Sequence, residues 1–569
     1  MRYTLLLVAV LATFCAVAQD AGLAMQSKKI QPASSREPVF VSFAPSSIRF
    51  KKDSLAEIKQ QSAWRLSAWK GEKVHTQLLV LSEKDIDAVR ITAVDLKSKQ
   101  GQVIKKDNIT TGFVQYVMTD EFKGGCGKRN AADLDSSLVA DIINTNISSV
   151  KLAANTPQPV WLSIKVPANT KPGEYTGTVT VAADKKYVLN IALNVVDKTL
   201  PIPDQYQFEL DLWQNPVAVA RIHQVPLWSD AHFALMKKYY TMLAGAGQKA
   251  ITVSIINEPW GHQTYDDYPS LIKWTKKKNG EWQYDYSLFD RYVSFVMSCG
   301  ISNRINCYSM VPWKLEFSYY DEALGMDTVF KQPIGTPAYN EFWSRMLTDF
   351  TAHLKSRNWF EKTTIAMDER PMEAMKSVIA LLKSVDKDWK IALAGDYHGE
   401  IEKDIYDYCV ASRFTFPDEV LARRKSEGKI STWYTCCMEP FPNGFTFSPP
   451  DEHVWMGWYT AAAKMDGYLR WAYNSWTKEP LKDSRFTSWP AGDTYQVYPG
   501  PLSSIRFEKL IEGIQDFEKI EILRKTYAKN NQADKLRMLE EALTNFDLKK
   551  LTVANADEMV AQVKMLINR

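Results

Sequence analysis

The part of the chain after residue 205 alternates between short apolar runs and amphipathic stretches, and this rhythm constrains the fold more than any other feature. Amphipathic stretches such as AYNEFWSRMLTDFTAHLKSR and PMEAMKSVIALLKSV separate most of the runs. Alternation of strand and helix favours parallel pairing, and eight units close a barrel. We therefore predict an α/β fold with a (β/α)8 TIM barrel over residues 205–503; the alternative is an open doubly wound sheet. The eight runs are FELDLWQN (208–215), AITVSIIN (250–257), INCYSM (305–310), TTIAMDE (363–369), KIALAGDY (390–397), VASRFTF (410–416), STWYTCC (431–437) and GYLRWAYN (467–474).

The residues before and after the barrel have different patterns. From about 37 to 200 the apolar residues alternate with period two, as in KVHTQLLVLSE and GEYTGTVTVAADKKYVLNIALNVVD, between turn residues. This predicts a β-sandwich domain over residues 19–200, joined to the barrel by the stiff segment KTLPIPDQ. Residues 504–569 are typical of helices, and we expect this C-terminal segment to pack on the barrel.

The first twenty residues, MRYTLLLVAVLATFCAVAQD, have the pattern of a secretory signal peptide. Arg2 precedes an apolar run, and Ala16-Val17-Ala18 is a small-residue cleavage site. We predict that residues 1–18 are removed and that the protein is exported, to the periplasm or the cell exterior. Lipid attachment at Cys15 is the alternative, although Phe14 is bulkier than the residue that this processing prefers. No later stretch is long enough to form a transmembrane segment.

The net charge and the aromatic content indicate which kinds of ligand this protein could bind. The formal net charge is +4, and no Lys/Arg-rich stripe is present, so we expect no nucleic-acid partner. The 18 Trp, 26 Tyr and 24 Phe supply flat rings of the kind that pack on sugar faces, besides filling the core. The His and Cys residues lack metal-ligand spacing, so we expect no zinc, no metal in the site and no cofactor, while a metal bound for structure alone is left open. Cys436 and Cys437 are interpreted as strand residues, and the pairing of the cysteines is left open.

Two adjacent carboxylates, Asp368 and Glu369, end the fourth apolar run. They could simply begin a helix, with Asp368 as its N-cap. However, catalytic groups of a barrel gather at the carboxyl ends of its strands, and these two residues occupy such an end. Two neighbouring carboxylates also resist joint ionisation, so one can hold a proton near neutral pH. A protonated acid beside an ionised partner is what cleavage of a glycosidic bond requires.

Adjacent carboxylates are poorly placed for the usual glycosidase mechanisms, in which the two acids lie on either side of the sugar. They suit a mechanism in which the 2-acetamido oxygen of the substrate attacks the anomeric carbon. In this interpretation Asp368 orients and polarises the acetamide, and Glu369 is the general acid and base.

Polar and aromatic residues at the other strand ends are candidates for binding the sugar. The three tryptophans among them could stack on the sugar ring or belong to the core. Tyr397 could donate to the acetamide carbonyl, His398 could support a neighbouring group, and Asp396 could bind a hydroxyl. The predicted substrate-binding residues are Trp260, Trp313, Asp396, Tyr397, His398, Tyr434, Asn474 and Trp476.

Several stretches in order resemble glycoside hydrolase family 123, the exo-acting β-N-acetylgalactosaminidases. They are EFKGGCGKRNAADLDSSLVAD (121–141), LDLWQNPVAVAR (210–221), NEPWGHQT (257–264), AMDERP (366–371), FPNGFTFSPP (441–450), GYLRWAYNSW (467–476) and SWPAGDTYQVYPGP with the following SIRFEKLIEGIQDFE. The resemblance implies a β-sandwich ahead of a (β/α)8 barrel. It also implies substrate-assisted cleavage, and its Asp-Glu pair corresponds to Asp368 and Glu369.

The expected substrate is therefore a glycan with a terminal β-linked N-acetylgalactosamine, cleaved with retention through an oxazoline-type intermediate. One alternative is a β-N-acetylglucosaminidase or an enzyme that accepts both sugars. Another is a glycan-binding surface protein without catalytic activity. The natural aglycone and the oligomeric state are left open.

Overall fold

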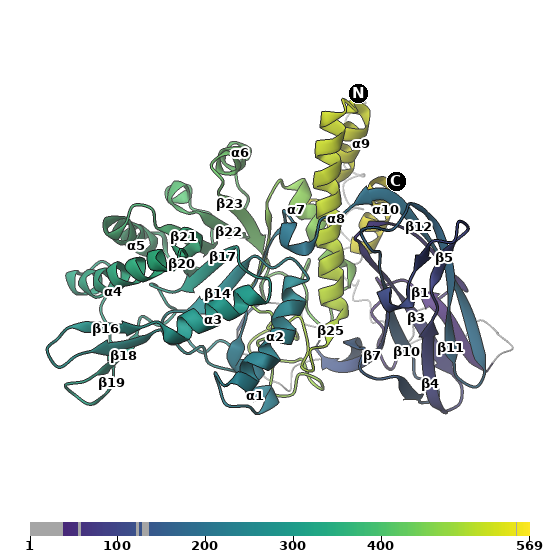
Figure 1. Ribbon diagram of the computed structural model, residues 1–569, viewed down its shortest axis with the longest axis horizontal. Helices are drawn as coiled ribbons and strands as arrows, with labels where there is room; N and C mark the ends of the chain where they lie inside the picture. The colour runs from purple at the N-terminus through teal and green to yellow at the C-terminus, as the bar shows by residue number, and fades with distance from the viewer. Residues whose placement is uncertain (1–37, 55–57, 121–124, 128–135, 554, 569) are drawn as a thin grey trace, which may run out of the picture.

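The computed structural model describes residues 38–54, 58–120, 125–127, 136–553 and 555–568. The predicted signal peptide, residues 1–18, lies outside the described residues. The described chain forms an N-terminal pair of sheets, an eight-stranded parallel sheet with helices, and a helical C-terminal segment (Figure 1). The predicted fold class is thus confirmed.

The N-terminal strands form two sheets that share one apolar core. Their orders are β1-β3-β10-β7-β8 and β2-β12-β11-β4-β9, and β5 and β6 extend the second sheet from β11. Along β12 every second residue from Leu189 to Val195 is buried, which gives the strand one core-facing side. The strands are β1 (Val39–Ala44), β2 (Ala63–Lys70), β3 (Lys73–Ser82), β4 (Ile86–Ala93), β5 (Leu96–Ser98), β6 (Val103–Ile104), β7 (Ile109–Thr119), β8 (Ser137–Asn144), β9 (Ser149–Leu152), β10 (Gln158–Lys165), β11 (Gly173–Ala182) and β12 (Lys186–Thr199).

The barrel strands pair in parallel in the order β13-β24-β23-β22-β21-β20-β17-β14, and a parallel bridge between Leu210 and Gln248 joins the two ends of this sheet. Most residues of these strands are buried, as expected where helices cover the outside and side chains fill the inside. The strands are β13 (Glu209–Leu212), β14 (Ala250–Ser254), β17 (Arg304–Tyr308), β20 (Thr363–Asp368), β21 (Lys390–Gly395), β22 (Asp407–Ala411), β23 (Ile430–Tyr434) and β24 (Gly467–Arg470).

The outer helices follow the strands in sequence, except that only a 3-10 turn (Glu402–Asp404) connects β21 to β22. Pro216, Ser229 and Thr336 occupy the first turn or N-cap of their helices, where a missing N–H or a side-chain acceptor is favourable. The helices are α1 (Pro216–His223), α2 (Asp230–Ala244), α3 (Ser287–Ser298), α4 (Pro337–Ser356), α5 (Met372–Val385), α6 (Asp418–Ser426) and α7 (Asp451–Ala462).

Two features differ from the sequence analysis. The sixth barrel strand begins at Asp407 and ends at Ala411, earlier than the run 410–416, because Asp407 is a buried charge that pairs with Arg304 at 3.1 Å. A small sheet that the sequence analysis missed lies beside the barrel, in the order β16-β15-β18-β19 (Figure 1). Its strands, inserted after β14 and β17, are β15 (Lys273–Lys276), β16 (Trp282–Asp285), β18 (Phe317–Asp321) and β19 (Met326–Phe330).

The C-terminal segment joins the two domains. Helix α8 (Ile505–Lys529) stands between the barrel and the N-terminal sheets, next to α9 (Ala533–Leu543) and α10 (Ala556–Ile567) (Figure 1). Just before α8, the short strand β25 (Ser503–Ser504) pairs with β8 of the N-terminal domain. The N-terminal domain is thereby bound to the chain on both sides of the barrel.

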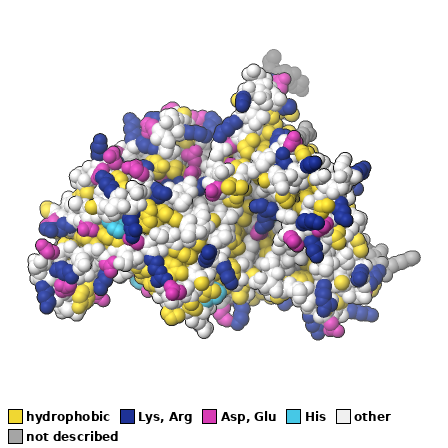
Figure 2. All heavy atoms as spheres, in the orientation of Figure 1, with side chains coloured by type: hydrophobic (Ala, Val, Ile, Leu, Met, Phe, Trp, Pro, Cys, Tyr) yellow, Lys and Arg dark blue, Asp and Glu magenta, His cyan; other side chains and the backbone are white. Residues whose placement is uncertain are grey.

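The surface gives two further facts. Figure 2 shows Lys and Arg side chains interspersed with Asp and Glu over the visible face. Among the described residues, no helix is both long enough and apolar enough to cross a bilayer.

Candidate active site

The paired carboxylates lie at the carboxyl end of β20. The first five residues of β20 are buried, Asp368 is half-buried, and Glu369 is exposed. Glu369 has a φ of +50°, a left-handed conformation that a non-glycine residue adopts at a cost. Its N–H donates to the carbonyl of Ala394 at 2.7 Å. This turn of the backbone allows both neighbouring side chains to face the mouth of the barrel.

Each carboxylate has its own hydrogen-bond donor. The indole N–H of Trp313 donates to Oδ2 of Asp368 at 3.0 Å, and the hydroxyl of Tyr434 donates to Oε1 of Glu369 at 2.7 Å. Trp313 comes from the segment after β17 and Tyr434 ends β23, so the donors approach from opposite sides. The guanidinium of Arg370 lies over the ring of Trp313, 4.4 Å from its centroid. The two acids are therefore held in different, fixed positions.

The surroundings of Asp368 also change its pKa. Burial, followed by the charge of Glu369, raises the pKa of Asp368 to about 7, while the hydrogen bond from Trp313 opposes the rise. Burial and the nearby Glu369 raise the pKa of Tyr434 well above its ordinary value, so Tyr434 remains a protonated donor. One proton can therefore reside on the pair near neutral pH.

The strand that carries the carboxylates contributes to a buried cluster of aromatic rings and alanines, the aromatic floor of the site. Trp213 packs on Trp260 and Tyr308, with ring centroids 5.0 and 4.8 Å away. Trp260 packs on Tyr308 at 4.9 Å and on Tyr268 at 4.6 Å. The indole N–H groups of Trp213 and Trp260 are buried without a hydrogen-bond partner. The small residues of the same cluster are Ala366, Ala392, Ala394 and Ala411.

Several predicted binding residues belong to the core instead, which corrects the sequence analysis. Trp476 is fully buried against Tyr239, and its indole donates to the carbonyl of Val497. Asn474 is fully buried and exchanges hydrogen bonds with the backbone of Asn215. The third tryptophan, Trp260, is 4% exposed and forms part of the floor described above. Their ring faces and amide are occupied by the protein.

The fifth strand end carries two more of the predicted binding residues. Tyr397 packs on Tyr408 and Phe416, with ring centroids 6.0 and 5.4 Å away, and its predicted contact with an acetamide stays a prediction. His398 is half-buried, and its backbone N–H donates to the hydroxyl of Tyr408. Tyr434 supplies a hydroxyl to Glu369.

Asp396 lies at the rim and forms an ion pair with Arg413, and both side chains are about half exposed. Arg413 acts electrostatically on Tyr434 and Glu369, so it belongs to the same site. The sequence analysis missed Arg413 because it placed this residue within the sixth strand. It also did not select Arg370, Trp213 and Tyr308 as site residues. Their positions beside the carboxylates and at strand ends were signals that could have found them.

Two groups of described residues have metal-ligand proximity. Cys126, Cys436 and Cys437 lie together, and Cys126 and Cys437 form a disulfide. This pairing places Cys437 in a loop, whereas the sequence analysis interpreted it and Cys436 as strand residues; β23 ends at Tyr434. The second group is Glu258, His262 and Asp267, in the loop after β14.

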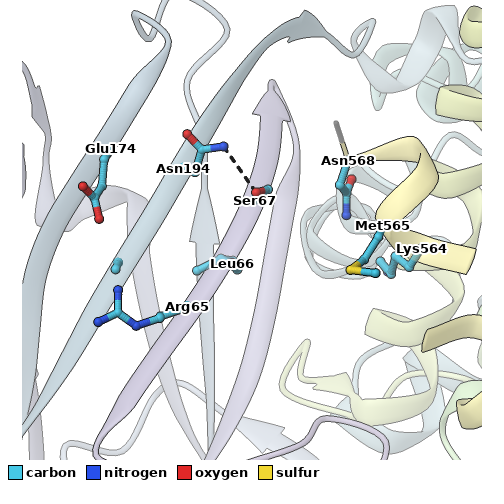
Figure 3. A pocket seen from close by; sticks show the side chains of 9 residues that line it. Arg65, Leu66, Ser67, Glu174, Asn194, Lys564, Met565 and Asn568 are labelled. Atoms are coloured by element: carbon cyan, nitrogen blue, oxygen red, sulfur yellow. Dashed lines mark hydrogen bonds between the residues drawn. The ribbon is translucent and has the colours of Figure 1, made fainter. Parts of the chain in front are cut away.

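A cavity of about 710 Å³ lies away from the carboxylate pair, between the N-terminal domain and α10 (Figure 3). One hydrogen bond, from Asn194 to Ser67, crosses its floor at 3.3 Å. No aromatic side chain lines it, and it includes none of the residues around Asp368 and Glu369. Its lining is Arg65, Leu66, Ser67, Glu174, Ala192, Asn194, Lys564, Met565 and Asn568.

A parallel barrel with two separately hydrogen-bonded carboxylates at a strand end, above an aromatic floor, defines a barrel glycoside hydrolase. Residues 213–523 match the family model for the glycoside hydrolase 123 catalytic domain, and residues 43–183 match that for the glycoside hydrolase 123 N-terminal domain. The chain belongs to glycoside hydrolase family 123, and its activity is that of a glycosidase.

Among solved structures, the chain is similar to a family 123 glycoside hydrolase from Clostridium perfringens that was analysed for glycolipid glycan hydrolysis. The two are 25% identical with a TM-score of 0.85, over 93% of this chain and 97% of that one. A family 39 glycoside hydrolase from Bacteroides cellulosilyticus is 12% identical with a TM-score of 0.34, over 76% of this chain and 82% of that one, which is too low to carry an argument. No curated protein matches the chain.

Proposed function

We propose that this protein is a retaining exo-glycosidase that removes terminal, non-reducing β-linked N-acetylgalactosamine from a glycan. The observation that carries the proposal is the pair Asp368 and Glu369, adjacent in sequence at one strand end, with separate donors at 3.0 and 2.7 Å. Because neither acid faces the other across a sugar-sized gap, the usual mechanisms with one acid on each side of the sugar do not fit. A mechanism in which the substrate supplies the nucleophile fits this arrangement.

In the proposed first step, the acetamide oxygen of the sugar attacks the anomeric carbon and the bond to the leaving oxygen breaks. Ionised Asp368 accepts the acetamide N–H and stabilises the positive charge of the oxazolinium-like intermediate. Glu369 gives its proton to the leaving oxygen. In the second step Glu369 takes a proton from water, whose oxygen attacks the anomeric carbon and reopens the ring. Two inversions leave the anomeric configuration unchanged.

The aromatic residues of the site support a hexosamine as the substrate. Trp213, Trp260 and Tyr308 are buried and form the apolar packing of the site. Trp313, in contrast, is 44% exposed beside Asp368 and offers an indole ring to the CH-rich face of a sugar. The similarity to the Clostridium perfringens enzyme, analysed for glycolipid glycan hydrolysis, makes a glycolipid one candidate source of the sugar. Glycoproteins and polysaccharides are the others.

We also propose that the protein is exported. The N-terminal pattern of residues 1–18 supports this, and so does the disulfide between Cys126 and Cys437, since disulfides persist in oxidising compartments. Detection of the mature N-terminus at Gln19 by mass spectrometry would test the cleavage site. A lipid on Cys15 would contradict it.

The central experiment compares Glu369→Gln with the wild type on aryl β-N-acetylgalactosaminides. We expect the variant to lose turnover of poor leaving groups by about 100- to 10,000-fold, because proton donation is lost, and to lose much less on a dinitrophenyl glycoside. Glu361→Gln, at an exposed residue of the turn that precedes β20, is the control that keeps activity.

Proton NMR of the first-formed sugar should show the β anomer. Equal activity on the N-acetylglucosaminide would favour the dual-specificity alternative. Efficient cleavage of a galactoside without the acetamide would contradict substrate assistance. Sugar binding without any turnover would favour a glycan-binding protein.

A further inference from the structure

A disulfide joins the two domains close to the catalytic pair. Cys126 lies in the N-terminal domain, in the connection from β7 to β8, and Cys437 lies in the barrel loop that follows β23. The two residues are 311 positions apart, and their Cα atoms are 5.0 Å apart.

Polar contacts on both sides hold the same segments together. The N–H of Gly127 donates to the carbonyl of Ser488 at 3.1 Å. The hydroxyls of Thr119 and Thr446 lie 2.7 Å apart, in a buried pair. The disulfide is therefore the covalent part of a wider contact between the N-terminal domain and the loops after β23 and β24.

The barrel end of the disulfide is three residues from the hydroxyl that contacts Glu369. Tyr434 closes β23 and donates to Glu369. Glu439, two residues beyond Cys437, binds the segment between Tyr434 and Cys437. One oxygen of Glu439 accepts from the N–H of Cys436 at 2.9 Å and the other from the hydroxyl of Ser412 at 2.6 Å. The carboxylate fixes the loop on the barrel side, and the disulfide fixes it on the side of the N-terminal domain.

We propose that the Cys126–Cys437 disulfide is a positioning element of the active site, which fixes the loop after β23 and thereby the hydrogen bond from Tyr434 to Glu369. The N-terminal domain thus contributes to catalysis through a covalent clamp. This inference rests on the proposed role of Glu369 as the proton donor. Small displacements of a catalytic group cost large factors in rate, so a loop held on one side only would be a poorer support.

A third cysteine lies beside the clamp. The sulfur of Cys436 is within 4.8 Å of the other two. Burial, and then the charge of Glu439, raise the pKa of Cys436, which keeps it a neutral thiol at neutral pH. Since thiolates and not thiols attack disulfides, this neighbour is a weak competitor for the bond.

The test uses the full mature chain with Cys126→Ser, and Cys436→Ser as the matched control. Peptide mapping without reduction should first find Cys126 joined to Cys437 in the wild type. We expect Cys126→Ser to lower kcat about tenfold on a phenyl β-N-acetylgalactosaminide and less than about threefold on the dinitrophenyl glycoside, with KM changed less than about twofold. Cys436→Ser should retain the disulfide and the wild-type values.

Reduction of the wild type provides a second measurement that does not depend on folding of a variant. Dithiothreitol delivers two electrons and two protons to the disulfide, which becomes two thiols, and is itself oxidised to its cyclic disulfide. The same selective loss on the phenyl substrate should appear and should reverse on reoxidation. Cys126→Ser should not respond to the reductant.

Three results would overturn the clamp: equal losses on both substrates with only a lower Tm, unpaired Cys126 and Cys437 in the purified protein, or a metal ion held by the three sulfurs. In each case an active wild type and an impaired Glu369→Gln variant would leave the proposed function intact. A wild type inactive on both substrates would instead overturn the proposed function, and the clamp with it.

Discussion

Asp368 and Glu369 are consecutive residues with different surroundings, and this difference is the basis of their proposed division of labour. Asp368 is half-buried and takes its hydrogen bond from an indole, whereas Glu369 is exposed and takes its bond from a phenol. With its pKa raised to about 7, Asp368 is partly protonated in the free protein at neutral pH. In the proposed mechanism Asp368 is ionised while Glu369 carries the one proton of the pair, so activity should fall as the pH rises through this value and the pair loses that proton.

Trp313→Phe should move this pH dependence. The indole N–H stabilises the ionised form of Asp368, so its loss raises the pKa of Asp368 further. A hydrogen bond to a charged group is worth about 1.5 kcal/mol, which corresponds to about one pH unit. We expect the alkaline limb of kcat/KM to shift upward by about that amount, because the pair then keeps its proton to a higher pH. Trp282→Phe, in the small sheet, is the control, and an unshifted limb in Trp313→Phe would contradict the assignment.

Asp368→Asn should lower the glycosidase activity and raise the free energy of unfolding at neutral and higher pH. A carboxyl pKa raised from 3.8 to about 7 means that the folded protein loses stability as the pH rises through this window, because the unfolded chain ionises first. The rise sets a ceiling of about 4 kcal/mol on the gain above pH 7. Denaturation at pH 4 and pH 8 should show the variant's advantage only at the higher pH.

Replacing Asp386, an ion-paired carboxylate, should change stability in the opposite direction to Asp368→Asn. Lys355 holds the pKa of Asp386 below its ordinary value, so the ionised form of Asp386 stabilises the fold. Asp386→Asn should therefore lower stability at pH 8, with little effect at pH 3. A stability gain in this variant as well would show that the effect of Asp368→Asn is not specific to the buried pair.

At the scale of elements, the ends of the paired strands β20 and β21 leave no room for a side chain at Gly395. A Cβ on Gly395 would approach the Cα of Glu369 to 3.2 Å, and Gly395 has a φ of +155°. Glycine is therefore required where the backbone turns at Glu369. The hydrogen bond from Glu369 to Ala394 depends on the same approach.

Gly395→Ala should separate these two strand ends and displace Glu369. We expect kcat to fall about 10- to 100-fold, because a shift of about 1 Å in a catalytic group has effects of that size. Gly428→Ala is the control, because Gly428 also has a positive φ, +67°, but has no atom near its missing Cβ. Both variants should lose stability, and only Gly395→Ala should lose turnover; equal turnover in the two would contradict the argument.

At the scale of the whole molecule, the two domains share their core with the C-terminal helices. Trp69 of the N-terminal domain belongs to the same apolar cluster as the barrel, and its indole donates to the carbonyl of Ile567. Asp141 is buried, and burial alone would raise the pKa of its carboxyl. The charges of Arg506 in α8 and of Arg49 outweigh this effect and hold the pKa of Asp141 below its ordinary value. We therefore expect the sandwich and barrel to unfold together.

Asp141→Asn should destabilise the entire protein in a single transition. It leaves the buried charges of Arg49 and Arg506 without their carboxylate, at a cost of about 3–5 kcal/mol. Differential scanning calorimetry measures both the loss and the number of transitions. Asp197→Asn breaks the exposed pair with Lys70 and should change stability by less than about 1 kcal/mol. Two separate transitions in Asp141→Asn would contradict a shared core.

Local patterns predicted much of the fold and the centre of the site. Period-two alternation identified strands such as β12, and apolar runs identified the barrel strands. Both patterns are visible in the sequence because a strand face that is buried carries apolar residues. Asp407 concealed the start of β22, because its charge is balanced by Arg304, which is about a hundred residues away in the sequence. Partners of this kind leave no local signal.

The binding residues show the same limit. Trp313 and Trp476 are both tryptophans near strand ends, yet one is 44% exposed beside Asp368 and the other is fully buried. Residue type and position relative to a strand are the same for both. Only the packing of α2 and the loop before α8 decides that Trp476 faces Tyr239 and Val497.

The sequence by itself determined the class of fold and the two adjacent carboxylates at the end of β20, because hydrophobic periodicity and neighbouring acids are properties of residues close in the chain. The tertiary structure alone decided which donors reach Asp368 and Glu369, and which cysteine of the barrel joins Cys126. These pairings connect residues between 55 and 311 positions apart. Contacts over such separations are set by how layers pack, and no local pattern encodes them.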